Sequence, residues 1–523
     1  SISRIPKGYF VQLTATNCAT GEMLASSGDD ASSNTRILRA VQKVSVDLRS
    51  KLGESLKSVQ KYDKPLELTT SSFDALRALS MARKSRRDGK RTEQIAWLRR
   101  AVEFDPSFAY GYAALSVDAW NRRQHDQAAE YARRAFDLRE QATEREKFYI
   151  MDKYYGNATG QLEEQIQSAR VWASVYPRDY SALASLCTAY GVAGQYEKGL
   201  QAALDAIRID PDAVTPYGNA MGYYAAMGRF DDAKRMYDEA RNRQITYGHL
   251  PVYYYDVAFI RHDAAAMQQA VAESLKNDAE DEISLEMALV EAYYGRMQKA
   301  AGLIDRVLEA ARRTKNEAGI ARAYAGRAHL EAIFGLKREA QKDAAAALPA
   351  ASSPEMLASA GWALARAGDL TQAAAIEKQL EQRYPLHTIV NRVFLPILRA
   401  EMANARNRPQ EAIAALESAR PYELTSTGET RNLYAIYLRG ESHLWAHEGQ
   451  AALQEFQKIL DAPGIVMNSP LMPLSRLGVA RAYAELHDPR TRDKYVDFFT
   501  IWNEADSDLP IVLAARREYT AIR

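Results

Sequence analysis

The sequence has little cysteine, almost no net charge and no long apolar run. Its two cysteines, Cys18 and Cys187, are too few for a disulfide framework or a cysteine-based zinc site. The 68 Lys and Arg residues are balanced by 67 Asp and Glu residues, whereas a nonspecific nucleic-acid-binding protein needs a basic excess. The longest apolar stretches, residues 250–260 and 389–398, are shorter than a membrane span. We therefore expect no nucleic-acid partner and no membrane span in this chain.

The rest of the composition is that of a folded chain. Hydrophobic residues make up 47% and charged residues 26% of the sequence, as in average globular domains. The first ten residues contain neither an apolar h-region nor a small-residue cleavage site, so no signal peptide is visible. Because the chain opens abruptly before a strand-like segment, we expect a processed or truncated piece of a longer polypeptide.

A short pattern recurs along most of the chain: a glycine, any residue, a bulky residue, two mostly polar residues and a small residue. It begins at Gly194, Gly228, Gly295, Gly335 and Gly368. Gly160, Gly194 and Gly228 follow one another at a constant spacing, and His262 continues the series at the same interval. Degenerate or weak copies begin at Arg123, Asn407 and His447. A fixed period of this kind indicates a repeat architecture.

Helices flank each copy of the pattern. Apolar residues follow helical spacing, as at Tyr217, Ala220, Met221 and Tyr224. Prolines such as Pro211 then bar continuation of the second helix. Two helices in every stretch of roughly 34 residues are the tetratricopeptide signature. We predict an all-α fold, a tetratricopeptide-repeat α-solenoid of about twelve helical hairpins over residues 73–523, with units that lengthen toward roughly 40 residues after residue 281.

The N-terminal part of the chain differs from the repeats. Residues 9–16 and 22–26 read as two strands of a β-hairpin, and Ile37, Val41 and Val44 recur at helical spacing. We predict a partial α/β segment at residues 1–60 and a linker at residues 61–72. Because a hairpin plus one helix is marginal alone, its open edge is a candidate self-assembly surface. The residues assigned to that edge are Tyr9, Phe10, Val11 and Leu13.

Several segments resemble one known family. They include residues 52–60, Asp63-Lys-Pro-Leu-Glu67, residues 69–78, Arg145-Glu-Lys-Phe-Tyr-Ile150, Tyr154-Tyr155 with Thr159-Gly160, Trp172 with Tyr176-Pro-Arg-Asp179, and residues 455–460 with 464–466. The chain is similar over essentially its whole length to the tetratricopeptide region of large acidobacterial serine/threonine protein kinases. The resemblance implies a bacterial, extracytoplasmic repeat region that follows a kinase domain and a membrane span.

The kinase residues themselves are not in this sequence. No Gly-rich phosphate loop, Val-Ala-Ile-Lys strand, His-Arg-Asp loop or Asp-Phe-Gly occurs. No Ser-His-Asp order, Gly-x-Ser-x-Gly elbow or distinctive acidic pair stands out either. We therefore assign no catalytic residue and no cofactor, and we predict that the chain is not an enzyme.

His443 and His447 are the one pair with metal-ligand spacing. Their i, i+4 positions share a helix face, but a third ligand and the glutamate of a metalloprotease helix are lacking. Packing is the favoured interpretation, and we predict no metal site.

Two sets of residues are candidates for partner binding. Thirty tyrosines are unusual, and clustered ones must place some rings outside the repeat core, where tyrosine favours interfaces. The favoured interpretation of the densest basic run is a solvated helix end and turn; the alternative is a contact for an acidic partner or for lipid headgroups. The candidates are Tyr253, Tyr254, Tyr255, Tyr293, Tyr294, Arg83, Lys84, Arg86 and Arg87.

These observations predict a non-catalytic scaffold whose solenoid groove binds peptides or proteins. A first alternative is a structural subunit that self-assembles head-to-tail into an extracellular filament or ring through the solenoid ends and the sheet edge. A second alternative is the sensor region of a transmembrane serine/threonine kinase. The sequence does not distinguish the partner or the oligomeric state.

Overall fold

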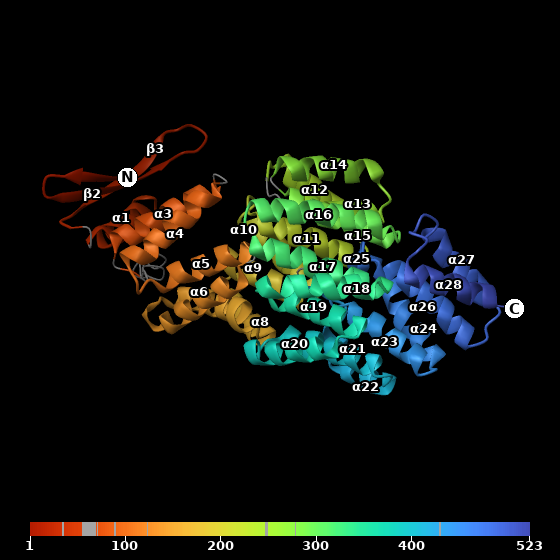
Figure 1. Ribbon diagram of the computed structural model, residues 1–523. Helices are drawn as coiled ribbons and strands as arrows, with labels where there is room; N and C mark the ends of the chain where they lie inside the picture. Colours follow the sequence, from red (N-terminus) through yellow and green to blue (C-terminus); the bar gives the residue numbers. More distant parts are fainter. Residues whose placement is uncertain are drawn as a thin grey trace. The chain divides into compact units, whose positions relative to one another are not determined.

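The computed structural model describes residues 1–33, 36–54, 70, 72–87, 90–122, 124–245, 249–277, 279–427 and 430–522 (Figure 1). The chain divides into two compact units. Unit 1 comprises residues 1–122 and 127–158, and unit 2 comprises residues 123–126 and 159–523. The predicted linker at residues 61–72 lies outside the described residues, apart from Thr70 and Ser72.

Unit 1 begins with a three-stranded antiparallel sheet in the order β1-β2-β3. Its strands are β1 (Ile2–Ile5), β2 (Gly8–Thr16) and β3 (Met23–Ala31). Helix α1 (Ile37–Lys51) covers one face, where its residues Ile37 and Ala40 are buried with Val11 of β2. The predicted two-strand hairpin is therefore incomplete, because the short strand β1 offers too few residues to show a clear alternating pattern.

The strand order also corrects the predicted sheet edge. Tyr9 of β2 pairs with Arg4 of β1 on one side and with Ala31 of β3 on the other. Phe10 and Val11 are flanked in the same way, so these three residues lie in the central strand. Leu13 lies past the end of β1 and pairs with Ser27 of β3. The outer strands β1 and β3, rather than residues 9–11, form the edges of the described sheet.

The helices of unit 1 follow the sheet and α1. They are α3 (Phe73–Arg87), α4 (Arg91–Phe104), α5 (Ala109–Asn121), α6 (His125–Asp137), the short helix η2 (Arg139–Gln141), α7 (Glu144–Lys153) and the π-helical turn η3 (Tyr154–Thr159). Small buried residues such as Ala101 and Ala113 let the helices approach closely. Thr143 caps α7 through a capping box with Glu146.

Unit 2 is a run of helical hairpins. Its helices up to residue 383 are α8 (Leu162–Val175), α9 (Tyr180–Val192), α10 (Tyr196–Ile209), α11 (Val214–Ala226), α12 (Phe230–Asn242), α13 (His249–Ile260), α14 (Ala264–Lys276), α15 (Glu280–Tyr293), α16 (Met297–Arg313), α17 (Glu317–Phe334), α18 (Lys337–Ala347), η4 (Leu348–Ala350), α19 (Pro354–Ala367) and α20 (Leu370–Arg383). The remaining elements are η5 (Val390–Phe394), α21 (Leu395–Ala405), α22 (Pro409–Ala415), η6 (Leu416–Tyr422), β4 (Ser426–Thr427), β5 (Thr430–Arg431), α23 (Tyr434–Trp445), α24 (Gly449–Leu460), α25 (Pro463–Val466), α26 (Leu471–Glu485), α27 (Thr491–Ile501) and α28 (Pro510–Ala521).

The turns inside the hairpins share one backbone feature. Each turn position that the sequence predicts between Gly160 and His447 has a positive φ, and so has His487. This is the left-handed conformation that ends a helix, and residues other than glycine adopt it at four of the turns. The positions are Gly160, Gly194, Gly228, His262, Gly295, Gly335, Gly368, Asn407, His447 and His487. The predicted tetratricopeptide-repeat solenoid is confirmed, including the weak turns at Asn407 and His447.

The two helices of a hairpin differ in how they are buried. In the later hairpins the first helices are buried nearly all round: α19 buries twelve of its 14 residues and α23 nine of its 12. The second helices bury only a stripe: α20 buries three of its 14 residues. A helix that is apolar all round belongs in an interior. In these later hairpins the first helices α19 and α23 therefore form an inner layer, and the second helices α20 and α24 an outer layer.

A second set of contacts joins repeats that are far apart in sequence. We call it the seam: the contacts that residues 384–388, 422–425, 464–468 and 502–510 make with hairpins formed by residues 160–335. Thr388 donates its amide to the Gly160 carbonyl at 2.9 Å and accepts the Leu162 amide on its hydroxyl at 3.1 Å. The Tyr196 hydroxyl donates to the Leu424 carbonyl at 2.8 Å. The partners of these side-chain bonds lie 226 and 228 residues apart in the chain.

The seam continues to the C-terminal repeats. Asn468 donates its amide to Asp256 and Glu286, at 2.8 Å each. Trp502 donates its indole N–H to the Tyr293 carbonyl at 2.9 Å, and the Asp506 amide donates to the Gly295 carbonyl at 3.0 Å. Turns at one edge of the solenoid thus meet loops at the other edge, and unit 2 is closed on itself rather than extended.

The lengthened repeats supply the residues of the seam. The turns at Gly368, Asn407, His447 and His487 are spaced more widely than those at the start of unit 2. The additional residues form η6 with the strand pair β4 and β5, and α25. Helix α25 contacts α11 and α13, which lie far before it in the sequence, and Figure 1 shows it beside this group of helices. The longer repeat period seen in the sequence therefore provides the residues that form the seam.

Space at the seam is tight at its glycines. A Cβ on Gly295 would lie 2.7 Å from the Cβ of Ala505 and 2.9 Å from the Trp502 ring, whereas a Cβ on Gly368 would meet nothing within 4 Å. Both glycines have positive φ, at 72° and 97°.

We predict that Gly295→Ala destabilises the chain more than Gly368→Ala does. Both variants carry the backbone strain of a left-handed alanine, roughly 1–2 kcal/mol, but only the first also forces the seam apart. Urea unfolding measures the two losses, and hydrogen exchange at residues 502–510 should rise only in Gly295→Ala. Equal losses and equal exchange would contradict a tight seam.

Candidate functional site

The inner face of unit 2 is a packed interior where the inner helices α17, α19 and α23 meet. The His329 ring of α17 lies 4.5 Å from the Tyr434 ring of α23, and Trp362 of α19 lies 5.8 Å from both rings. Residues three hairpins apart are thus in contact. The predicted open groove is therefore filled by aromatic side chains along this part of the solenoid.

Charged side chains are buried in the same interior. Arg366 donates to Glu401 at 3.2 Å and to Glu441 at 2.8 Å. Burial raises the pKa of Glu401, while the charge of Arg366 and the Tyr434 hydroxyl oppose that rise. Burial, with the charge of Arg366, lowers the pKa of His329 to about 3, so its imidazole is neutral near pH 7. Arg366, Glu401 and Glu441 thus pair with one another inside the unit, while the buried Nδ1 of His329 has no hydrogen-bond partner among the described residues.

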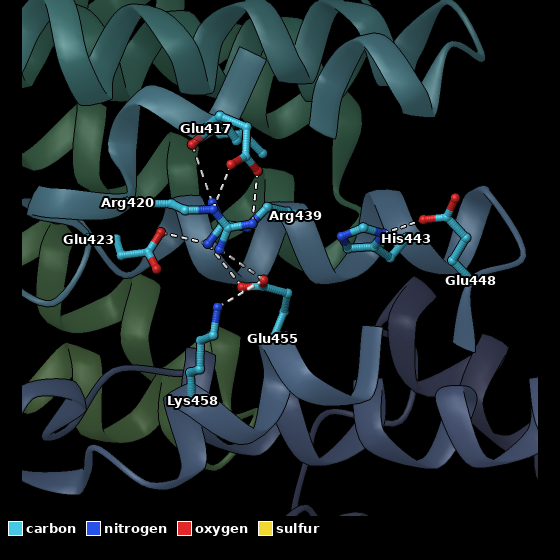
Figure 2. Close-up of polar contacts among 9 residues, drawn as sticks. Glu417, Arg420, Glu423, Arg439, His443, Glu448, Glu455 and Lys458 are labelled. Atoms are coloured by element: carbon cyan, nitrogen blue, oxygen red, sulfur yellow. Dashed lines mark hydrogen bonds and ion pairs between the residues drawn. The ribbon is translucent and has the colours of Figure 1, made fainter. Parts of the chain in front are cut away.

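A second buried network fixes the loop that enters the seam. Figure 2 shows the fully buried guanidinium of Arg439 between two carboxylates, with Glu423 at 2.6 Å and Glu455 at 2.9 Å. Glu455 also accepts from Lys458 at 2.9 Å and from Arg420 at 3.4 Å. Because Glu423 precedes Leu424, the network anchors the segment that meets Tyr196. We interpret this network as structural.

The two histidines with metal-ligand spacing bind different carboxylates. His443 Nδ1 lies 2.6 Å from Glu448, and His447 Nδ1 lies 3.0 Å from Glu485. The His447 side chain is 81% exposed, at a turn of positive φ. Within the part of the chain that the structure describes, no group of three or more His, Cys, Asp or Glu could hold a metal ion. The described helices include none that is long and apolar enough to cross a membrane.

The five candidate tyrosines are mostly packing residues. Tyr254 and Tyr255 are 3% and 5% exposed, and Tyr254 stacks on Tyr237 with 4.0 Å between ring centroids. A surface role for these two is wrong, because α13 buries nine of its 12 residues and Tyr254 and Tyr255 are among them. Tyr293 and Tyr294 pack edge-on against Phe259.

Tyr253 is the exception among the five tyrosines. It is 53% exposed on α13 and lies beside Gly218 of the preceding inner helix. Tyr253 belongs to unit 2, whereas the candidate arginines belong to unit 1. The two sets of candidates therefore do not form one site within either unit.

The basic run forms the exposed end of α3. Arg83, Lys84 and Arg86 are exposed, and among the described residues no carboxylate forms an ion pair with any of the three. Arg87 ends the same helix, and its side chain lies outside the described residues. Together with Tyr253, this run is the part of the prediction that the structure leaves accessible.

Two tyrosines that were not predicted lie next to these arginines. Arg83 donates to the Tyr110 hydroxyl at 3.2 Å, with its guanidinium 5.5 Å from the Tyr110 ring centroid. The Tyr110 ring, from α5, stacks on Tyr149 of α7 with 5.0 Å between centroids. We call Arg83, Arg86, Tyr110 and Tyr149 the arginine–tyrosine face. It joins the first helices of three successive hairpins, α3, α5 and α7.

The electrostatics of the face are basic. Burial raises the pKa of Tyr149, and the positive charges of Arg86 and Arg83 act in the opposite direction. Lys153 lies 5.2 Å from the Tyr149 ring centroid, but it pairs with the buried carboxylate of Asp152 at 2.5 Å. The repeat register, which places first helices side by side, could have indicated Tyr110; no pattern in the sequence singles out Tyr149.

We predict that Arg439→Met destabilises unit 2 strongly. Methionine fills the volume but leaves the carboxylates of Glu423 and Glu455 without their shared cation, which costs roughly 3–5 kcal/mol. The control Arg420→Met removes a 41% exposed partner and should cost roughly 0–1 kcal/mol. Urea unfolding followed by circular dichroism measures both. A loss in Arg439→Met no larger than that in the control would contradict the structural role.

A third prediction concerns pH. Burial and the nearby charge of Asp343 raise the pKa of Glu331 to about 8, although Arg327 opposes the shift. Because the pKa of Glu331 is higher in the folded than in the unfolded state, the folded state binds the proton more tightly. The free energy of unfolding therefore decreases as pH rises from about 4.5 to about 8, where the folded state keeps a proton that the unfolded state has lost.

Glu331→Gln should remove that loss and flatten the pH dependence of the thermal midpoint between pH 5 and pH 8.5. The stability gain at pH 8 should be roughly 2–5 kcal/mol, from about 1.4 kcal/mol per pKa unit. Glu309→Gln, at an exposed position of α16, is the matched control and should leave the slope unchanged. An unchanged slope in Glu331→Gln would show that Glu331 is ionised throughout.

Comparison with known proteins yields distant structural similarity alone. No protein-family model and no curated protein matches the sequence. Yeast Tom70 has a TM-score of 0.33 and 13% identity, and the match covers 86% of this chain and 95% of that one. The APC/C hetero-tetramer Cut9–Hcn1 gives 0.42 and 11%, covering 92% and 94%. A tetratricopeptide repeat protein from Parabacteroides merdae gives 0.31 and 11%, covering 45% and 91%.

Proposed function

We propose that this chain is a non-catalytic scaffold that binds a protein partner through the arginine–tyrosine face of unit 1. The observation that carries the proposal is that Arg83, Lys84 and Arg86 are exposed beside a stacked tyrosine pair, with no carboxylate partner among the described residues. Arginine and tyrosine are the residues enriched where interfaces derive most of their binding energy. The face lies on the first helices of three successive hairpins.

The packed interior of unit 2 is a second reason to place partner binding on the arginine–tyrosine face of unit 1. Its inner helices fill the interior with Trp362, Tyr434 and the paired Arg366. A partner that enters there would have to displace packed rings and break buried ion pairs, which costs several kcal/mol for each uncompensated charge. The seam also holds the hairpins of unit 2 in a fixed arrangement. We assign to unit 2 the role of a rigid body.

The two alternative functions drawn from the sequence, self-assembly into a filament or ring and a kinase sensor region, stay predictions. Self-assembly through the sheet would use its edge strands β1 and β3, where Met23 and Leu24 are 64% and 56% exposed. Sedimentation velocity of the full chain at micromolar concentration separates a polymer from a monomer. The extracytoplasmic location and the kinase-sensor role rest on the family resemblance alone.

We expect a photo-crosslinker to locate the partner. p-Benzoylphenylalanine at Lys84, on α3, should yield a defined crosslinked species from an extract of the source cells. The same probe at Arg99, an exposed position of α4, is the matched control and should yield none. Mass spectrometry identifies the crosslinked chain. The proposal fails if Lys84 gives no crosslink, or if both positions give the same products.

A further inference from the structure

We propose that the arginine–tyrosine face recognises an acidic, extended peptide segment of its partner. In this arrangement the side-chain carboxylates of the peptide pair with Arg83 and Arg86, and an apolar or aromatic side chain lies against the Tyr110–Tyr149 pair. The inference rests on the proposed function, because it names the class of ligand for that face.

Charge is the first reason. Helix α3 carries five basic residues, Arg77, Arg83, Lys84, Arg86 and Arg87, against the single acid Asp74. The large buried arginines of unit 2 behave differently: Arg366 and Arg439 each contact two carboxylates within the chain. Exposed cations such as Arg83 and Arg86, which the described residues leave without a carboxylate, are complementary to anionic groups on another molecule.

Orientation is the second reason. The guanidinium of Arg83 is held by the hydroxyl and the ring of Tyr110, at 3.2 Å and 5.5 Å. A planar fork that is already positioned loses less conformational freedom when it pairs with a carboxylate in two-point geometry. Arg86 lies one turn after Arg83 on α3, so both side chains extend from neighbouring positions of one helix surface.

The tyrosine pair is the third reason. Tyr110 and Tyr149 form a stacked pair with 5.0 Å between centroids and 30° between planes, and it joins α5 to α7. Both tyrosines are half-buried, so the part of the stacked pair that faces solvent is a rigid apolar surface that does not need to be ordered on binding. Cations beside a rigid aromatic surface fit a peptide that alternates acidic and apolar side chains better than they fit a uniformly charged polymer.

Nucleic acid is a different class of anion, and the distribution of charge disfavours it. The chain as a whole has 68 basic and 67 acidic side chains. Lys90, three residues after the end of α3, pairs with Glu93 at 3.5 Å, so an acidic side chain follows the basic run closely in the sequence. Phosphate-backbone binding needs several cations along a stripe, because each neutralised phosphate contributes separately.

The test uses the full chain and a defined probe. The probe is a fluorescein-labelled peptide of three Glu-Glu-Leu-Tyr repeats, and fluorescence anisotropy measures its Kd. We expect Arg83→Glu combined with Arg86→Glu to weaken binding roughly tenfold to one hundredfold, since tenfold corresponds to about 1.4 kcal/mol. Arg99→Glu with Arg100→Glu, on the exposed side of α4, makes the same change in net charge and should alter Kd by less than about threefold.

Further variants separate charge from geometry. Arg83→Lys with Arg86→Lys keeps both charges but loses the fork and should give intermediate affinity. Tyr110→Ala should weaken binding more than Tyr110→Phe, which keeps the ring and loses the hydroxyl bond to Arg83. Circular dichroism confirms that each variant retains its helices before its Kd is compared.

The binding and crosslinking results distinguish a wrong ligand class from a wrong binding face. It is overturned if the two arginine double variants lose affinity equally, because net charge alone would then explain binding. It is overturned if a Lys-Lys-Leu-Tyr peptide or a twelve-nucleotide oligouridine binds as tightly as the acidic probe. If Lys84 crosslinks a partner but the acidic probe does not bind, the ligand class is wrong and the scaffold stands. If Lys84 crosslinks nothing, the proposed function itself fails.

Discussion

The contact between hairpin turns and loops some two hundred residues further along the chain is the constraint on which unit 2 depends. Gly160, Gly295 and Gly335 can approach these loops only because they lack a side chain at positions of positive φ. The seam formed there joins the two edges of the solenoid. A stack of hairpins that contact only their neighbours would be flexible along its length, and the seam removes that freedom.

Closure also determines what the interior of unit 2 contains. First helices three hairpins apart meet, so His329, Trp362 and Tyr434 pack where an open solenoid has its groove. Charged residues in such a place must be paired, because burial of an isolated charge is costly. Arg366 and Arg439 are each held by two carboxylates. The interior therefore stabilises a unique arrangement and is poorly suited to ligands.

Arg83 of unit 1 lies in a different environment from the buried arginines of unit 2. On α3 it faces a tyrosine ring and solvent rather than carboxylates. Arg366 and Arg439 are thus structural cations, whereas Arg83 is an accessible one. The difference lies in the surrounding residues and in exposure, which the amino-acid type alone does not reveal. It is the physical basis for placing partner binding on α3, α5 and α7.

The sequence by itself determined the repeat: the constant period, the helical spacing of apolar residues and the turn glycines are local features, and they predict the hairpins correctly even at His262 and Asn407. It also indicated the basic run on α3. Only the tertiary structure decided that Tyr254 is core, that β2 is a central strand and that Tyr110 meets Arg83. Periodicity describes what neighbours in sequence do, whereas these outcomes depend on contacts between residues tens to hundreds of positions apart.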